Sequence, residues 1–331
     1  MKIGVLNKFV PDQYKCSKPI SFVPVAPPRN RWWRSTGAGS NTRNMEFVPK
    51  GKLIAIGGAE DKGNGTDRNG DSGNFVEKGI LRRVVDEMGG PSIRIALITT
   101  ASSIPVEVAE NYQDAFGKLG VKELDILDIR ERADVTPEMA SRLEAANGVM
   151  ISGGNQLRLT TIFGGTEFLK VLKRRYREEA GFVIAGTSAG AMCMSSTMIY
   201  QGQSASGLVK GGVKMTTGLG LVNDVVIDTH FVKRGRFSRL TQTIAANPTA
   251  LGVGLGEDTG VVITNGDNME SIGSGQVMIF DGHDISYSNL ADVDEGDVFS
   301  IEGMRIHIIS KGHSYSLSNR KFTATPKVVH G

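Results

Sequence analysis

A serine stands between two glycines where an apolar run gives way to a segment typical of a helix. The motif Gly-Thr-Ser-Ala-Gly occupies residues 186–190, after the run 181–185 and before residues 191–194. A strand that turns into a helix at a serine lifts the hydroxyl clear of the backbone, and glycines two residues to either side leave room for the turn. The helix also directs unpaired N–H groups toward the attacked carbonyl. The motif therefore predicts a nucleophile elbow at Ser188.

A serine hydroxyl is a weak nucleophile at neutral pH, so a neighbouring base must take its proton. The chain contains five histidines, and His230 closely follows the apolar run 225–227. Because ligands gather at the carboxyl ends of parallel strands, this position is expected to face the same edge as Ser188. The other four histidines lie in turns, in a strand or near the terminus. We therefore expect His230 to be the general base.

The base needs an acidic partner that holds its tautomer and stabilises the imidazolium. Glu257 and Asp258 lie in a turn bounded by apolar residues, and Asp228 is a local competitor. Asp228 lies two residues from His230 on an extended segment and would point the same way, which is awkward for orienting the ring. The spacing favours Glu257 and leaves the two aspartates open.

Backbone N–H groups near the nucleophile are the expected donors to the oxyanion. Ala189 directly follows Ser188 and supplies one such group. Gly153 and Gly154, at the end of the run 149–152, offer the second. The polar pair Asn155-Gln156 comes next and places Gln156 within expected reach of the substrate.

Three arginines, Arg234, Arg236 and Arg239, follow the expected base within nine residues. Guanidinium groups bind carboxylates through two parallel hydrogen bonds. A basic run beside the base therefore predicts an anionic substrate.

Strand-length apolar runs alternate with amphipathic stretches of helix length from residue 52 onward. The strand candidates are 53–56, 93–99, 124–129, 149–152, 182–185 and 225–227, and the helix candidates are 75–88, 106–119, 137–146 and 167–179. This alternation predicts an α/β fold with a mostly parallel central sheet covered on both faces. From about residue 260 the chain becomes β-rich and predicts sheet extensions or hairpins, at 261–264, 276–280, 298–301 and 304–310.

Residues 1–44 differ in composition from the rest of the chain. They hold five of the eleven prolines and carry four Lys and four Arg against one Asp, a net charge of +7. The total is +3, so residues 45–331 carry −4. We expect a basic, poorly ordered extension over 1–44 and a catalytic domain over 45–331. The acidic balance of that domain argues against nucleic-acid binding.

The two cysteines, Cys16 and Cys193, provide neither a disulfide framework nor a metal-ligand spacing. A reducing cytoplasm is the simplest location for such a chain. No apolar segment follows Lys2, and no apolar run of membrane-spanning length occurs, so no membrane association is expected. The predicted chemistry needs no metal and no cofactor.

Together these motifs resemble those of the cyanophycinases, a serine peptidase group that also includes the α-aspartyl dipeptidase peptidase E. The resemblance spans about residues 50–265. It rests on the segments 56–61 (Ile-Gly-Gly-Ala-Glu-Asp), 152–156, 186–191, 228–231 with the three arginines, and 256–258.

The resemblance implies a three-layer α/β sandwich similar to class I glutamine amidotransferases, and a homodimer. It also implies Ser188 as nucleophile, His230 as base and Glu257 as acid, an order that differs from the order in α/β-hydrolases. Thr229 stands where cyanophycinases often carry glutamine, so one substrate contact differs. The other positions that the family uses to hold substrate correspond to Gln156, Asp228, Arg234, Arg236 and Arg239.

Cyanophycin has a poly-aspartate backbone with arginine on each β-carboxyl, and the family releases β-Asp-Arg dipeptides through an acyl-enzyme. Two alternatives stay open: an α-aspartyl or isoaspartyl dipeptidase, and a non-catalytic binding protein with an amidotransferase-like fold. A cysteine amidotransferase is disfavoured, because Cys193 lies five residues beyond the elbow serine.

Overall fold

The computed structural model describes residues 48–64 and 73–325. The expected extension over residues 1–44 lies outside these ranges. No helix in the described ranges is both long and apolar enough to cross a membrane.

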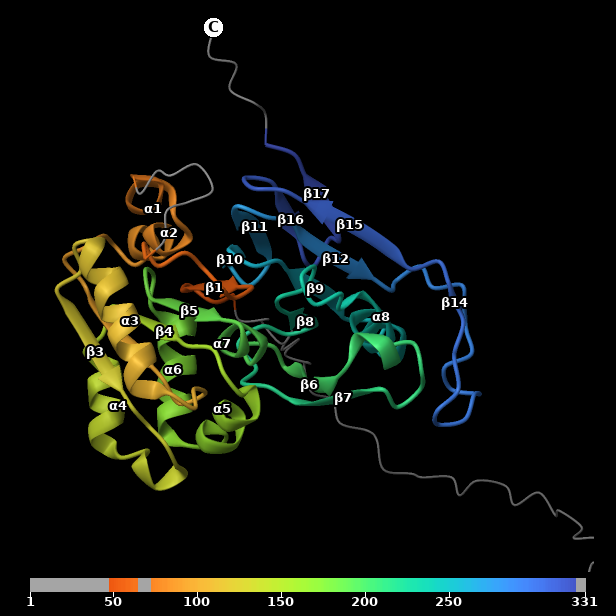
Figure 1. Cartoon of the computed structure of the whole chain (residues 1–331), viewed down its shortest axis with the longest axis horizontal. Coiled ribbons are helices and arrows are strands. Elements are labelled where there is room, and N and C mark those ends of the chain that lie inside the picture. Colours follow the sequence, from red (N-terminus) through yellow and green to blue (C-terminus); the bar gives the residue numbers. More distant parts are fainter. Residues whose placement is uncertain (1–47, 65–72, 326–331) are drawn as a thin grey trace, which may run out of the picture. The chain divides into compact units, whose positions relative to one another are not determined.

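The central feature is a nine-stranded sheet in which the five strands on one side run parallel to each other (Figure 1). The five parallel strands, in spatial order, are β3 (Glu123–Leu127), β2 (Arg94–Ile98), β4 (Gly148–Ile151), β5 (Val183–Thr187) and β1 (Lys52–Ile56). Their near-continuous apolar sequences reflect burial on both faces. Beyond β1 the sheet continues with the antiparallel strands β10 (Thr259–Thr264), β11 (Asn268–Gly273), β16 (Ser314–Ser316) and β17 (Lys321–Thr323). The expectation of an α/β fold on a large, mainly parallel sheet with β extensions from the C-terminal part is confirmed.

Helices cover both faces of the parallel strands. Side chains of β1 alternate, with Leu53 and Ala55 on one face and Ile54 and Ile56 on the other. The first face packs against α4 (Pro137–Glu144), α5 (Gln156–Phe163) and α6 (Glu167–Glu178). The second packs against α1 (Gly73–Lys78), α2 (Ile80–Glu87) and α3 (Pro105–Lys118).

The stretch 75–88, expected to be one helix, is two helices. Gly79 interrupts it with an extended backbone at φ −62°, ψ 154°, and its N–H donates to Phe75 O at 3.2 Å. A Cβ at position 79 would lie 2.5 Å from that same carbonyl oxygen. The glycine therefore permits a sharp corner that the apolar periodicity does not reveal.

The run 225–227 does not join the central sheet, and that expectation is wrong. It forms β8 (Val225–Asp228), which pairs in parallel with β9 (Leu251–Leu255) at the edge of a second, four-stranded sheet. The edges of β1 and β5 are already taken by β10, β4 and each other, so no position is left for β8 beside them. The other two strands of the second sheet are β12 (Val277–Asp281) and β15 (Arg305–Ile309).

Smaller elements complete the described structure. The helix α7 (Ala189–Met192) follows the elbow, and α8 (Phe237–Ala246) connects β8 to β9. Two hairpins are formed by β6 (Thr197–Gly202) with β7 (Val213–Thr217) and by β13 (Tyr287–Ser288) with β14 (Ile301–Glu302). Of the expected β run 298–301, only Ile301 lies in a strand.

Candidate active site

Ser188 lies at the sharp turn between β5 and α7. Its backbone adopts φ 50° and ψ −111°, a conformation that costs a non-glycine residue about 1–3 kcal/mol. The flanking glycines permit the close approach that the turn needs. A Cβ on Gly186 would lie 2.5 Å from Gly190 O, and a Cβ on Gly190 would collide with Ile151 O. The elbow motif therefore has a steric basis on both sides of the serine.

The structure brings Ser188, His230 and Glu257 into one hydrogen-bonded line. Oγ of Ser188 lies 3.1 Å from Nε2 of His230, and Nδ1 of the same ring lies 2.7 Å from Oε1 of Glu257. Because a carboxylate only accepts, Nδ1 carries the ring proton and Nε2 is left to accept the serine hydroxyl. Lys233 Nζ donates to the second oxygen of Glu257 at 2.8 Å.

The end of β1 holds the three segments of this line in register. Three successive carbonyl groups, those of residues 56–58, each accept one backbone N–H from a different segment. The bonds are Ser188 N to Ile56 O at 2.9 Å, His230 N to Gly57 O at 2.8 Å, and Asp258 N to Gly58 O at 3.0 Å. Hydrogen bonds to the end of β1 thus bring His230, two residues after β8, next to Ser188, although β8 belongs to another sheet.

Gly58 also shapes the position of the imidazole. It has a φ of +97°, and a Cβ there would lie 2.5 Å from both Nε2 and Cε1 of His230. Any side chain at this position would push the ring away from Ser188. Position 58 therefore needs glycine both for its backbone conformation and for the ring that packs on it.

The pKa values of His230 and Glu257 are both lowered. Burial lowers the pKa of His230, and the positive charge of Arg234 acts in the same direction against the bond to Glu257. Burial would raise the pKa of Glu257, but hydrogen bonds from Lys233 and His230 outweigh it. At neutral pH the pair is therefore a neutral imidazole beside a carboxylate, the state in which Nε2 can accept a proton.

Ser188 and His230 face a cleft of about 690 Å³. Its lining also includes Gly153, Gly154 and Arg234. A Cβ on Gly153 would lie 3.3 Å from Cβ of Ser188, so this glycine backbone lies beside the nucleophile. Ala189 is the first residue of α7, where N–H groups have no partner within the helix. The backbones of Ala189 and Gly153, two of the three expected oxyanion donors, thus lie beside Ser188, and Gly154 also lines the cleft.

The three arginines that follow His230 have different surroundings. Arg234 is exposed and lines the cleft. Arg239 is buried, and its Nε donates to Oδ2 of Asp228 at 2.6 Å. Arg236 Nη1 donates to Oδ1 of Asp228 at 3.1 Å and to Thr229 O at 2.8 Å. Asp228 itself is fully buried, so the two cations neutralise it inside the protein.

Gln156 and Thr229 are not among the residues that line the cleft. Nε2 of Gln156 donates to Ile199 O at 2.9 Å. Thr229 is fully buried, and its hydroxyl has no hydrogen-bond partner within residues 48–64 and 73–325.

Sequence reasoning assigned no role to Glu60, which lines the cleft and contacts Thr187, the residue before the nucleophile. Its carboxylate accepts from the hydroxyls of Thr187 and Tyr112, each at 2.5 Å, and from Lys62 Nζ at 2.8 Å. Burial raises the pKa of this carboxyl, but the charge and hydrogen bond of Lys62, with the two hydroxyl bonds, lower it below its usual range. Its position two residues after the glycine pair that follows β1 was the available signal.

The chain is similar to known peptidases in sequence and in fold. The model of peptidase family S51 matches residues 69–271. Cyanophycinases from Thermosynechococcus vestitus and Trichormus variabilis are 38% and 34% identical to this chain, cover 84% of it, and are themselves covered over 83% and 89% of their lengths. A crystal structure of a peptidase from an acI-B1 actinobacterium matches with a TM-score of 0.57 at 20% identity, over 82% of this chain and 99% of that one, and is similar in fold.

The fold and the family match define a serine-type peptidase. More narrowly, the chain belongs to peptidase family S51. The resemblance to cyanophycinases seen in the sequence motifs is confirmed.

Proposed function

We propose that this protein is a cyanophycinase, a serine exopeptidase that hydrolyses the poly-aspartate backbone of cyanophycin to β-Asp-Arg dipeptides. The observation that carries the proposal is the line of Ser188, His230 and Glu257, with contacts of 3.1 and 2.7 Å, at the floor of a cleft that Arg234 lines. The cyanophycinases that match over most of their length support the choice of substrate.

The reaction begins with attack of Ser188 Oγ on the scissile carbonyl carbon while Nε2 of His230 takes the hydroxyl proton. Glu257 stabilises the imidazolium that forms. The N–H groups of Ala189 and of Gly153 or Gly154 donate to the oxyanion, and a missing donor costs about 10²- to 10³-fold in turnover. The imidazolium then protonates the leaving amine. Water deprotonated by Nε2 finally releases the acyl group from Ser188.

Arg234 is the residue that we assign to the anionic part of the substrate. The arginine joined to each β-carboxyl keeps a free α-carboxylate that ordinary peptide substrates lack at this position, and an exposed guanidinium at the cleft provides a charge-assisted partner for it. We assign only an indirect role to Arg236, Arg239 and Asp228. Their mutual ion pairs fix the segment that carries His230.

We further infer that residues 45–331 act as one catalytic domain with a class I glutamine amidotransferase-like arrangement of layers. Helices on both faces of the parallel strands support this inference. The homodimer and the cytoplasmic location stay predictions of the sequence.

Digestion of purified insoluble cyanophycin, with mass measurement of the products, tests the proposal. We expect β-Asp-Arg as the main product and no release by the Ser188→Ala protein. Parallel assays on Asp-Leu and on isoaspartyl dipeptides address the dipeptidase alternative, and hydrolysis of these alone would overturn the proposal. Binding of the polymer without any hydrolysis by the wild-type protein would identify a non-catalytic binding protein.

A further inference from the structure

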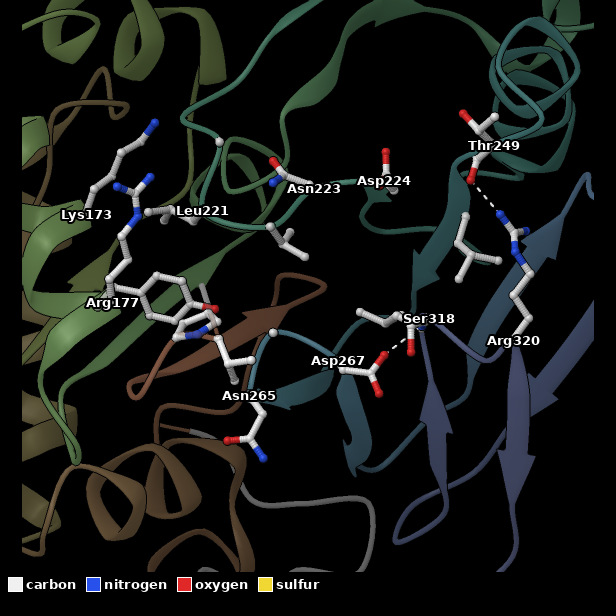
Figure 2. A pocket seen from close by; sticks show the side chains of 18 residues that line it. Lys173, Arg177, Leu221, Asn223, Asp224, Thr249, Asn265, Asp267, Ser318 and Arg320 are labelled. Atoms are coloured by element: carbon white, nitrogen blue, oxygen red, sulfur yellow. Dashed lines mark hydrogen bonds between the residues drawn. The ribbon is translucent and has the colours of Figure 1, made fainter. Parts of the chain in front are cut away.

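A second cavity, of about 770 Å³, lies apart from the cleft, and Figure 2 shows the side chains that line it. Its lining includes Asp224 and Leu251, at the amino ends of β8 and β9, and the turn 265–267 between β10 and β11. Ser188, by contrast, follows the carboxyl end of β5. The cavity and the cleft share no lining residue. The volume falls within the range of about 300–1,000 Å³ typical of small-molecule sites.

Two cations of α6, Lys173 and Arg177, line this cavity from one side. The arginines between them in sequence are paired, Arg174 with Glu144 and Arg175 with Glu179. Lys173 and Arg177 have no carboxylate within ion-pair distance in the part of the chain that the structure describes. Like charges four residues apart on a helix repel each other and destabilise it. An anion bound between them would remove that repulsion.

Two further observations on α6 favour an anion-binding site. Burial and the charge of Arg177 lower the pKa of Lys173, as expected for an ammonium with no negative partner. Tyr176 also lines the cavity, and its buried hydroxyl has no hydrogen-bond partner within the described ranges. An unpaired buried hydroxyl destabilises the protein, and a hydrogen bond to an oxygen of a ligand would offset that cost.

The carboxylates of the cavity lie apart from the two cations. Asp267 is already used, because it accepts from the Ser316 hydroxyl at 3.0 Å and from Ser318 N at 2.6 Å. Asp224 is exposed and has no ion pair among the described residues, and Figure 2 shows it away from Lys173 and Arg177. The uncommitted charges are therefore two cations on one side and one carboxylate on another.

Apolar side chains, as well as these charges, line the cavity. Leu221, Leu251 and Leu317 all line the cavity and are otherwise buried. A ligand that fits carries a carboxylate at one end, a cationic group at the other and a methylene chain between them. An arginine with a free α-carboxylate has this chemistry.

We propose that this cavity is a second binding site, remote from the nucleophile, for an aspartyl-arginine unit. The free carboxylate of the unit lies between Lys173 and Arg177, and its guanidinium group faces Asp224. This inference rests on the proposed function, because that function supplies the ligand. The unit comes either from the released β-Asp-Arg dipeptide or from a side arm of intact cyanophycin.

Calorimetric titration of the full-length Ser188→Ala protein with β-Asp-Arg tests the site without turnover. We expect a binding event that Lys173→Met or Arg177→Met, added to Ser188→Ala, weakens about tenfold or more, since each removes a charge-assisted contact. Lys170→Met is the matched control, because Lys170 lies on the same helix, pairs with Glu167 and does not line the cavity. Asp224→Asn should weaken β-Asp-Arg but not β-Asp-Ala, which lacks the guanidinium group.

Co-sedimentation of the same variants with insoluble cyanophycin separates the two sources of the ligand. Loss of sedimentation with Lys173→Met supports anchoring to the polymer, whereas weaker dipeptide binding with unchanged sedimentation supports a product site. An isotherm that Lys173→Met and Arg177→Met both leave unchanged would overturn the inference. Arg177 is exposed, so its variant keeps the test valid if Lys173→Met folds poorly. Failure of the proposed function would appear separately, as wild-type protein that cleaves no polymer.

Discussion

The two ends of the strands differ in how they balance charge. At the Ser188 end, Glu257, Glu60 and Asp228 each hold at least one cationic partner within the protein. At the opposite end, the cations Lys173 and Arg177 have no carboxylate partner in the described ranges. Arg234 is the comparable group in the cleft, a cleft-lining cation without an ion pair among the described residues.

This difference indicates what each set of charges does. A buried carboxylate with fixed cationic partners keeps one geometry and positions its neighbours, because separating the pair would leave an uncompensated charge. A cation without a partner is available to a ligand carboxylate. The comparison supports our proposals that the paired groups position their neighbours and that Arg234, Lys173 and Arg177 bind ligand carboxylates.

Ser188→Ala should have the largest effect on turnover. It should act on the Ser188 end of the strands and leave the cavity at the opposite end unaffected. We expect turnover to fall by about 10⁶-fold, as when the nucleophile of another serine peptidase is removed. Binding of β-Asp-Arg at the cavity should not change, because the cavity and the cleft share no lining residue. Initial rates and calorimetry on the same preparation measure both, and a Ser188→Ala protein that still turns over would refute the nucleophile assignment.

Gly58→Ala should reduce turnover by about 10²-fold or more, since small displacements of a reacting group have effects of that size. The new methyl group would collide with the His230 ring. Gly181→Ala is the matched control, because Gly181 also has a positive φ, +90°, but nothing lies within 4 Å of its Cβ position. We expect the control to lose stability and keep its turnover. Equal turnover of the two variants would contradict the steric role of position 58.

Glu60→Gln should lower the free energy of unfolding at pH 7 by about 1–3 kcal/mol, because a buried acceptor of three hydrogen bonds is replaced. The folded-state pKa of Glu60 is lowered, so its stabilisation is present above the unfolded pKa of about 4.3 and is lost as the pH falls through the folded pKa. Urea unfolding at several pH values should show the difference from wild type shrinking in acid. Glu110→Gln is the control, because Glu110 is exposed on α3. If Glu60→Gln lowers the free energy of unfolding no more than Glu110→Gln does, Glu60 is not a positioning group.

Arg234→Gln should have the smallest effect on turnover and a clear effect on its pH dependence. The positive charge of Arg234 lowers the pKa of His230, so its removal raises that pKa. The proposed mechanism needs neutral His230, so the acid limb of the kcat/KM profile, which reports the free enzyme, should move to higher pH. KM for the anionic substrate should rise as well. Lys170→Met provides the charge-matched control, and an unmoved acid limb would argue against contact between Arg234 and the base.

Much of the candidate site could be predicted because its signals are local. Ser188 lies in a motif whose glycines are needed within four residues of one another, and His230 and Glu257 closely follow strands. The same reasoning missed Glu60, whose partners Tyr112 and Thr187 are 52 and 127 residues away. It also gave Arg236 and Arg239 the same role as Arg234, because spacing alone does not show that Asp228 is fully buried and turns two of the three inward.

The sequence by itself determined the alternation of strands and helices, the elbow and the identity of the residues around it. Only the tertiary structure decided that β8 belongs to a second sheet and that His230 nevertheless meets Ser188. The physical reason is that three carbonyl groups at the end of β1 bind N–H groups from segments more than 130 residues away. Apolar periodicity reports which residues are buried, whereas the choice of partner depends on which strand edges and charges the folded chain leaves free.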